Sequence, residues 1–148
     1  MAGLSVTSES FEHGDPIPER HAVDGENLSP PLSWSGLPDA TQSIALICED
    51  PDAPSGTFVH WVAWGIDPEA GSLGEGEPAP GEGRNGFGNI GYGGPGPPPG
   101  HGMHRYFFRL YALDAEPGLQ PAASKQDLEA AVEGHVLATG EIMGTYER

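Results

Sequence analysis

The stretch SIALICEDPDAPSGTFVHWVAWGI, residues 43–66, predicts two β-strands joined by a polar turn. Residues 43–50 are apolar on both faces, which is typical of a covered central strand. Alternation in the second strand places five residues on one face, Phe58, His60, Val62, Trp64 and Ile66. Asp50 and Asp52 stand at the turn between the strands, and charges are costly to bury there unless they are paired or used.

The rest of the chain adds further strands and one helix. A capping-box pattern at Ser124 and Asp127, followed by helical spacing of apolar residues, predicts a helix over 124–140 with His135 packed on its apolar face. The predicted strands cover residues 5–11, 30–34, 104–114 and 141–147. On the third of these, His104 and Tyr106 share a face. The pattern indicates a single, mainly β domain over 1–148, a sandwich with one late helix.

Residues 71–102 form a long loop that is rich in glycine and proline. Long loops inside compact domains are usually functional or mobile. Residues 71–84 are acidic and predicted to be mobile. Residues 85–104 carry Phe87, Ile90 and Tyr92, which a free linker does not need, and are predicted to be ordered.

The charge balance excludes nucleic acid as a partner and indicates a salt-rich cellular environment. Asp and Glu number 22 against six Lys and Arg, a formal net charge of −16. Phosphate contacts need a basic surface, so nucleic acid is excluded as a partner. Such a surface predicts a protein of a halophilic cytoplasm, because repulsion is screened within about 3 Å at 1 M salt.

Cellular location is indicated by what the sequence lacks. The single cysteine, Cys48, allows no intrachain disulfide, which fits a reducing compartment. Residues 1–15 contain no basic region followed by an apolar run, so no signal peptide is predicted. The apolar runs are too short to span a bilayer, so we expect a cytoplasmic protein without stable membrane insertion.

Acidic and imidazole side chains can converge at one end of the predicted sandwich. Asp50 and Asp52 end one strand, His60 lies early on the next, and the loop GGPGPPPG leads to His104 and Tyr106. Imidazoles, a phenol and backbone N–H groups are hydrogen-bond donors suited to an oxyanion, and neighbouring carboxylates favour charged imidazoles. These residue types predict a small anion pocket that suits a phosphate head group.

Two motifs, DPDAPSGTFVHW (50–61) and GYGGPGPPPGHGMHRYFFRLYALD (91–114), resemble the phosphatidylethanolamine-binding protein family, in its short bacterial and archaeal Raf-kinase-inhibitor-like branch. GENLSPPLSW (25–34) and GHVLATGEIMGTYER (134–148) extend the resemblance over residues 24–148. It implies antiparallel sheets, a homodimer and a regulatory role through a protein partner, although kinase inhibition by longer members transfers poorly. The implied pocket residues are Asp50, Asp52, His60, Gly94, Pro95, His104 and Tyr106.

Two enzymatic alternatives use the same residues. Asp50, Asp52, His60, His101 and His104 offer ligands for zinc, with His101 and His104 spaced H-x-x-H, but no glutamate accompanies them as a base. Acid–base hydrolysis is the second alternative, but no serine or cysteine stands beside the histidines. The residues therefore favour a binding module over an enzyme, and predict no metal and no cofactor.

Overall fold

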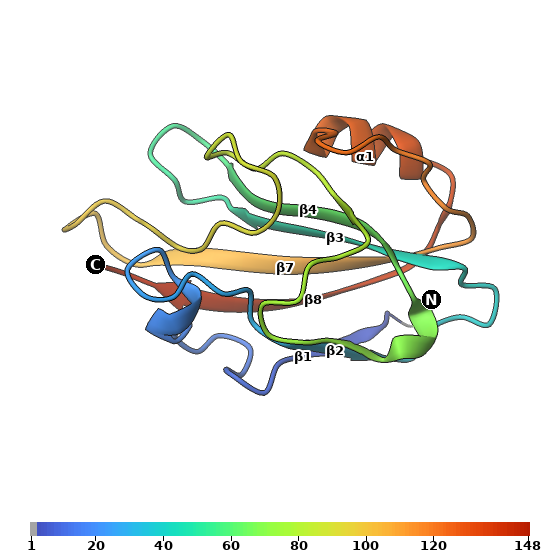
Figure 1. The fold of residues 1–148 in the computed structure, drawn as a ribbon. Helices are drawn as coiled ribbons and strands as arrows, with labels where there is room; N and C mark the ends of the chain where they lie inside the picture. Colours follow the sequence, from blue (N-terminus) through green and yellow to red (C-terminus); the bar gives the residue numbers. More distant parts are fainter. Residues whose placement is uncertain (1–2) are drawn as a thin grey trace.

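The computed structural model describes residues 3–148 and shows two β-sheets stacked face to face, with one helix on the outer face of the larger sheet (Figure 1). The smaller sheet has the order β1 (Ser5–Thr7), β2 (Leu32–Ser35), β5 (Ser72–Leu73). The larger has the order β6 (Gly81–Glu82), β4 (Phe58–Ile66), β3 (Ser43–Asp50), β7 (His104–Leu113), β8 (Val136–Tyr146). All neighbouring strands are antiparallel, which confirms the predicted sandwich.

β3 is the central strand of the larger sheet, and all of its residues are buried. Leu46 faces the core between the two sheets, whereas Ile47 faces the core beneath helix α1 (Lys125–Val132). Two covered faces explain why the sequence of β3 is apolar throughout. The core between the sheets includes Val6, Leu32, Trp34, Trp61 and Phe108, and the core under α1 includes Val62, Trp64, Leu113, Leu128 and Val132.

The predicted helix over 124–140 is correct at its start and wrong at its end. Ser124 and Asp127 form the capping box through two hydrogen bonds of 3.0 Å. The helix stops at Val132, and Gly134 follows with a φ of +82°. From Val136 the chain pairs with the whole of β7, so tertiary pairing overrides the local helical spacing.

His135 lies outside the helix, in the connection to β8, and is exposed. Its Nδ1 lies 2.8 Å from Asp114 Oδ1. The prediction that His135 packs on an apolar helix face is therefore wrong, because the helix that would have oriented it ends three residues earlier.

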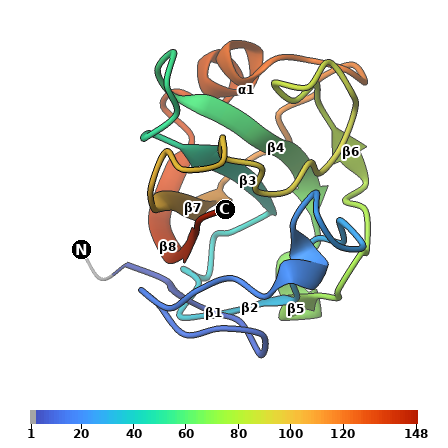
Figure 2. The same cartoon turned by 90° about the vertical axis from the view of Figure 1, so that its left-hand side faces the viewer.

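The Gly/Pro-rich segment contains more regular structure than its composition predicts. Within residues 71–84, predicted to be a mobile acidic loop, β5 extends the smaller sheet and β6 extends the larger one. Asn85 then orders the second part, as predicted, since its side chain donates to Gly91 O at 2.9 Å and accepts from Phe87 N and Asn89 N. The end-on view in Figure 2 shows this loop, the β3–β4 turn and the C-terminus at the same end of the sandwich.

No helix in residues 3–148 is long and apolar enough to cross a membrane. Cys48 is buried in the core between the sheets.

Candidate ligand-binding site

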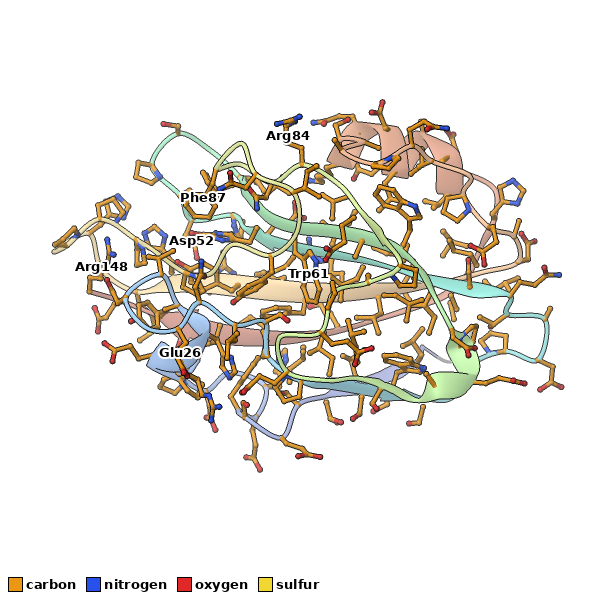
Figure 3. All side chains as sticks on the ribbon, viewed as in Figure 1. Glu26, Asp52, Trp61, Arg84, Phe87 and Arg148 are labelled. Carbon is orange, nitrogen blue, oxygen red and sulfur yellow. The ribbon has the colours of Figure 1, made fainter. Side chains whose placement is uncertain are left out.

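A cavity of about 200 Å³ lies at the end of the core between the sheets. It is enclosed by the β3–β4 turn, the start of β4, the start of β7 and the Gly-Pro loop, which we define as residues 93–103. Figure 3 shows Asp52, Phe87 and Arg148 at this same end of the molecule. The lining residues are Asp50, Ala53, Pro54, Phe58, His60, Phe87, Gly96, Pro97, Pro98, His104 and Tyr106.

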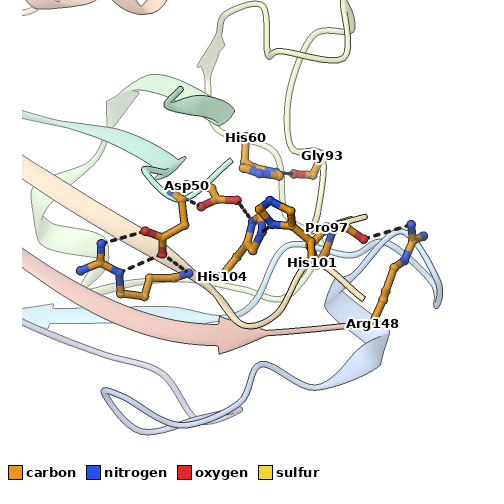
Figure 4. A network of polar contacts seen from close by, with 9 residues as sticks. Asp50, His60, Gly93, Pro97, His101, His104 and Arg148 are labelled. Carbon is orange, nitrogen blue, oxygen red and sulfur yellow. Dashed lines mark hydrogen bonds and ion pairs between the residues drawn. The ribbon is translucent and has the colours of Figure 1, made fainter. Parts of the chain in front are cut away.

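Asp50 and His104 form a buried pair at the base of the cavity. His104 is 1% exposed, and its Nδ1 donates to Asp50 Oδ2 at 2.6 Å (Figure 4). The other carboxylate oxygen of Asp50 accepts from the backbone N–H of Asp52 at 2.7 Å. Both oxygens are thus used within the protein, which fixes the carboxylate and, through it, the orientation of the His104 ring.

His60 lines the opposite wall and is oriented by the Gly-Pro loop. Its Nδ1 donates to Gly93 O at 2.7 Å, so its Nε2 remains for a ligand. Burial lowers the pKa of His60, while Gly93 and the Asp50 charge oppose that effect. His60 is therefore biased toward the neutral form, in which Nε2 accepts rather than donates.

A β-bulge places His60 in the cavity. The pairing of β3 with β4 shifts between Cys48↔Trp61 and Glu49↔Val59, which leaves His60 as the extra residue. The predicted strict alternation, with His60 on the face of Val62 and Trp64, is thus wrong. His60 instead packs against Tyr106, at a ring-centroid distance of 5.1 Å. Bulges of this kind commonly re-aim a side chain beside a functional site.

Tyr106 contributes a phenol that keeps its proton. Burial and then the charge of Asp50 raise the pKa of Tyr106 well above its ordinary value. The hydroxyl consequently remains protonated, and therefore a hydrogen-bond donor, at neutral pH and below.

The mouth of the cavity is aromatic. The Phe58 ring lies 4.9 Å from the His60 ring and 4.8 Å from the Phe87 ring, measured between centroids. Phe87 is 44% exposed although it is a large apolar residue. The site thus combines a polar base with an apolar rim.

The chain matches the model of a known protein family over most of its length. The family model described as phosphatidylethanolamine-binding protein matches residues 7–147. The chain belongs to the phosphatidylethanolamine-binding protein (PEBP) family. This confirms the resemblance seen in the two motifs around Asp50 and His104.

Relatives of this PEBP chain occur in archaea and bacteria. The UPF0098 protein of Methanothermobacter thermautotrophicus is 47% identical over 152 residues, which covers 98% of this chain and 99% of the relative. A PEBP homologue of Chlamydia trachomatis has a solved structure with a TM-score of 0.93 at 39% identity, covering 100% of this chain and 99% of that one. YbcL of E. coli, reported as a member of the mammalian PEBP family, has a TM-score of 0.91 at 31% identity and covers 99% of both chains.

Four predicted site residues of this PEBP chain line one cavity, Asp50, His60, His104 and Tyr106. Asp52 does not line it. Its carboxylate accepts from the backbone N of Arg105 at 3.0 Å and from the guanidinium at 2.9 Å. These bonds lower the pKa of Asp52. The expectation that Asp52 holds an imidazole is therefore wrong, since Arg105 takes both oxygens.

Gly94 and Pro95 are predicted pocket residues that do not line the cavity. Gly94 N donates to Asn27 Oδ1 at 2.8 Å, so this N–H is not free for an anion. A Cβ on Gly94 would lie 2.1 Å from the carbonyl oxygen of His21, which explains the need for glycine. Gly96, Pro97 and Pro98 form the wall instead, one to three residues further along the loop.

Phe58 and Phe87 line the cavity although neither is among the predicted pocket residues. Phe58 had a usable signal, since it lies two residues before His60 on the same strand. His101 was considered only as a candidate zinc ligand in the H-x-x-H pair, and its Nδ1 lies 2.6 Å from His104 Nε2. Across residues 3–148, no cluster of three or more His, Cys, Asp or Glu side chains is arranged to hold a metal ion.

Proposed function

We propose that this chain is a binding module for a small anionic group, with phosphate as the favoured chemistry, and that the group binds in the cavity between His60 and His104. The observation that carries the proposal is the convergence of two buried imidazoles and a protonated phenol on one cavity of about 200 Å³. Membership of the PEBP family supports a ligand-binding role. The wider proposal includes regulation through a protein partner.

The charge balance of the cavity makes anion binding depend on protons. The two carboxylate oxygens of Asp50 accept hydrogen bonds from His104 and from the backbone N–H of Asp52. Neither oxygen therefore requires a hydrogen bond from a ligand. Since Nδ1 of His60 is committed to Gly93 O, His60 donates to an anion only when Nε2 is protonated. A bound anion favours the charged imidazole, so binding raises the pKa of His60 and takes up a proton.

The size of the cavity limits the ligand to a head group. Drug-sized ligands occupy sites of roughly 300–1,000 Å³, whereas this cavity measures about 200 Å³. A phosphate with a short substituent fits such a volume. Phe58 and Phe87 at the mouth offer apolar contact to the part of the ligand that leaves the cavity.

The lining supports binding over catalysis. No serine or cysteine is among the described residues that line the cavity, so it offers neither of the usual hydroxyl or thiol nucleophiles. We therefore propose a protein that is not an enzyme and that needs no cofactor.

We extend the proposal to the cellular environment and to the oligomeric state. The net charge of −16 favours a cytoplasm rich in salt, and the resemblance to short PEBP relatives favours a homodimer. The salt dependence of stability tests the first point, and a protein destabilised by sodium chloride would contradict it. Analytical ultracentrifugation tests the second, and a monomer at high protein concentration would contradict it.

The site is tested by an NMR titration with inorganic phosphate and phosphoethanolamine, following the ring signals of His60 and His104. We expect saturable shifts of both rings. In His60→Ala and His104→Ala the affinity should fall about tenfold or more, because each loses a charge-assisted hydrogen bond. His135→Ala is the matched control, since it removes an exposed histidine far from the cavity.

Two results would overturn the proposal. The first is a wild-type protein whose rings do not respond to either phosphate compound at any pH where it is folded. The second is a response to zinc without a response to phosphate, which would favour the metal alternative instead.

A further inference from the structure

His101 and His104 share a short contact that the anion site does not use. His101 Nδ1 lies 2.6 Å from His104 Nε2, and the ring centroids are 4.8 Å apart (Figure 4). His104 already donates from Nδ1 to Asp50, so in neutral His104 the Nε2 atom is an acceptor. His101 must then be the donor. Two nitrogens this close hold one proton between them.

This contact occupies the ring nitrogen that an anion would need. His104 has two ring nitrogens, and Asp50 takes one while His101 takes the other. An anion in the cavity therefore receives no hydrogen bond from His104 until His101 moves away. His101 competes with the ligand, although it does not line the cavity itself.

The backbone around His101 permits that movement. His101 lies between Gly100, with a φ of +77°, and Gly102, with a φ of +99°, and a Cβ on either glycine would meet no atom within 4 Å. Two backbone hydrogen bonds anchor this turn, from His101 N to Pro98 O at 3.1 Å and from Gly100 N to Arg148 O at 3.4 Å. The His101 side chain is exposed. Its contact with His104 is thus a main restraint on the ring.

We propose that His101 is a pH-sensitive cap on the anion site, closed at neutral pH and released by acid. The proposal rests on the proposed function, because the cap regulates the same cavity. When both imidazoles are protonated, two N–H donors and two positive charges face each other, and the contact breaks. His104 Nε2–H is then free to donate to the anion.

The other charged groups around the pair do not supply this response. Arg105 is paired with Asp52, and Arg148 is paired with Asp24 through a contact of 2.5 Å. Their partners hold the pKa values of both carboxyls below the ordinary range, so the two pairs stay intact near neutral pH. The remaining groups that face the pair are Asp50 from β3, His60 from β4 and Tyr106 from β7.

Tyr106 keeps its proton, and His60 titrates without contacting His101. His60 makes anion binding pH-dependent in every variant that retains it. The contribution of the cap must therefore be measured as a difference between proteins with and without His101.

The experiment compares phosphate affinity in wild type and His101→Ala at constant ionic strength, near pH 7.5 and near pH 5.5. His135→Ala is again the control. At each pH both proteins meet the same mixture of phosphate species, so the ratio of affinities reports the cap. We expect His101→Ala to bind about three- to tenfold more tightly near pH 7.5, the value of one lost competing hydrogen bond. Near pH 5.5 the ratio should approach one.

A second readout needs no ligand. The ¹⁵N shift of His104 Nε2 reports whether it accepts a hydrogen bond, and it should change in His101→Ala at neutral pH but not in His135→Ala. An unchanged signal overturns the cap.

The outcomes separate the two proposals. Equal affinities at both pH values, or weaker binding by His101→Ala, overturn the cap and leave the anion site intact. If neither protein binds phosphate at either pH, the anion site is overturned, and the cap proposal fails together with it.

Discussion

Glu49 and Asp50 are consecutive acidic residues on β3, and the two faces of the larger sheet use them differently. Glu49, 8% exposed, accepts from Arg109 and Lys125 on the face covered by α1. Asp50, 3% exposed, accepts from His104 on the face toward the smaller sheet. One carboxylate has two permanently charged partners and the other has an imidazole.

The difference shows how the partner decides what a buried carboxylate can do. Arginine and lysine stay protonated throughout the physiological range, so the Glu49 cluster has one charge state. An imidazole, in contrast, is a side chain whose charge generally depends on its surroundings near neutral pH. The Glu49 cluster joins α1 to the sheet, whereas the Asp50 cluster opens onto a cavity.

The largest effect on the free energy of unfolding is expected when the carboxylates of Asp50 and Glu49 are each replaced by an amide. Asp50→Asn should lower the free energy of unfolding by about 2–3 kcal/mol, because an amide cannot accept from both His104 and the Asp52 N–H without burying an unpaired donor. Glu49→Gln should cost about 1 kcal/mol, since Arg109 and Lys125 can reach water. Urea denaturation of the two variants measures both values. Equal costs would mean that the two clusters do not differ in this way.

The buried histidines should account for the pH dependence of the free energy of unfolding. Burial lowers the pKa of His60 and of His21 in the folded state, so the unfolded chain binds more protons. The free energy of unfolding should therefore fall as pH drops below about 6.5, by at most about 1.4 kcal/mol per pH unit for each histidine.

Replacing His60 with Gln should reduce this slope and leave the part that His21 supplies, whereas Glu49→Gln should keep the wild-type slope. Thermal melting between pH 8 and pH 5 checks both variants. The carboxyls of Asp52 and Asp24 act in a separate window, because the stability that their lowered pKa values contribute is lost only as the pH falls below about 3.8. A slope unchanged in His60→Gln would contradict the assignment.

The smallest effect on the free energy of unfolding is expected when an exposed ion pair is removed, and it should depend on salt concentration. Arg105→Gln removes the partner of Asp52 and should cost about 0–1 kcal/mol in dilute buffer, and less in molar salt. The cost of Glu49→Gln should persist in salt, because buried pairs are screened less. Wild-type stability itself should rise with sodium chloride as repulsion among 22 acidic residues is screened. A protein destabilised by salt would argue against the halophilic setting.

Local sequence was sufficient for several elements. The two apolar faces of β3 followed from its composition, and the capping-box pattern at Ser124 marked the start of α1. The spacing of His104 and Tyr106 put both on the face that lines the cavity. Each of these depends on a short-range period or on a contact three residues apart.

Other features depended on partners distant in sequence. Residues 136–140 were predicted to belong to the helix, yet they pair with β7 as part of β8. Asp52 was expected to face an imidazole, but Arg105, 53 residues away, takes its carboxylate. The H-x-x-H spacing related His101 to His104 only as candidate zinc ligands, whereas the structure shows a direct contact between the two rings.

The sequence by itself determined the sandwich, its central strand and the residue types that meet at one end, because these depend on periodicity and on two motifs close to the functional residues. Only the tertiary structure decided which atoms face the cavity. The bulge at His60 turned that ring into the cavity, and Asp50 and His101 divided the two nitrogens of His104 between them. Ring orientation and hydrogen-bond partners are set by packing between strands far apart in the chain, which no local pattern records.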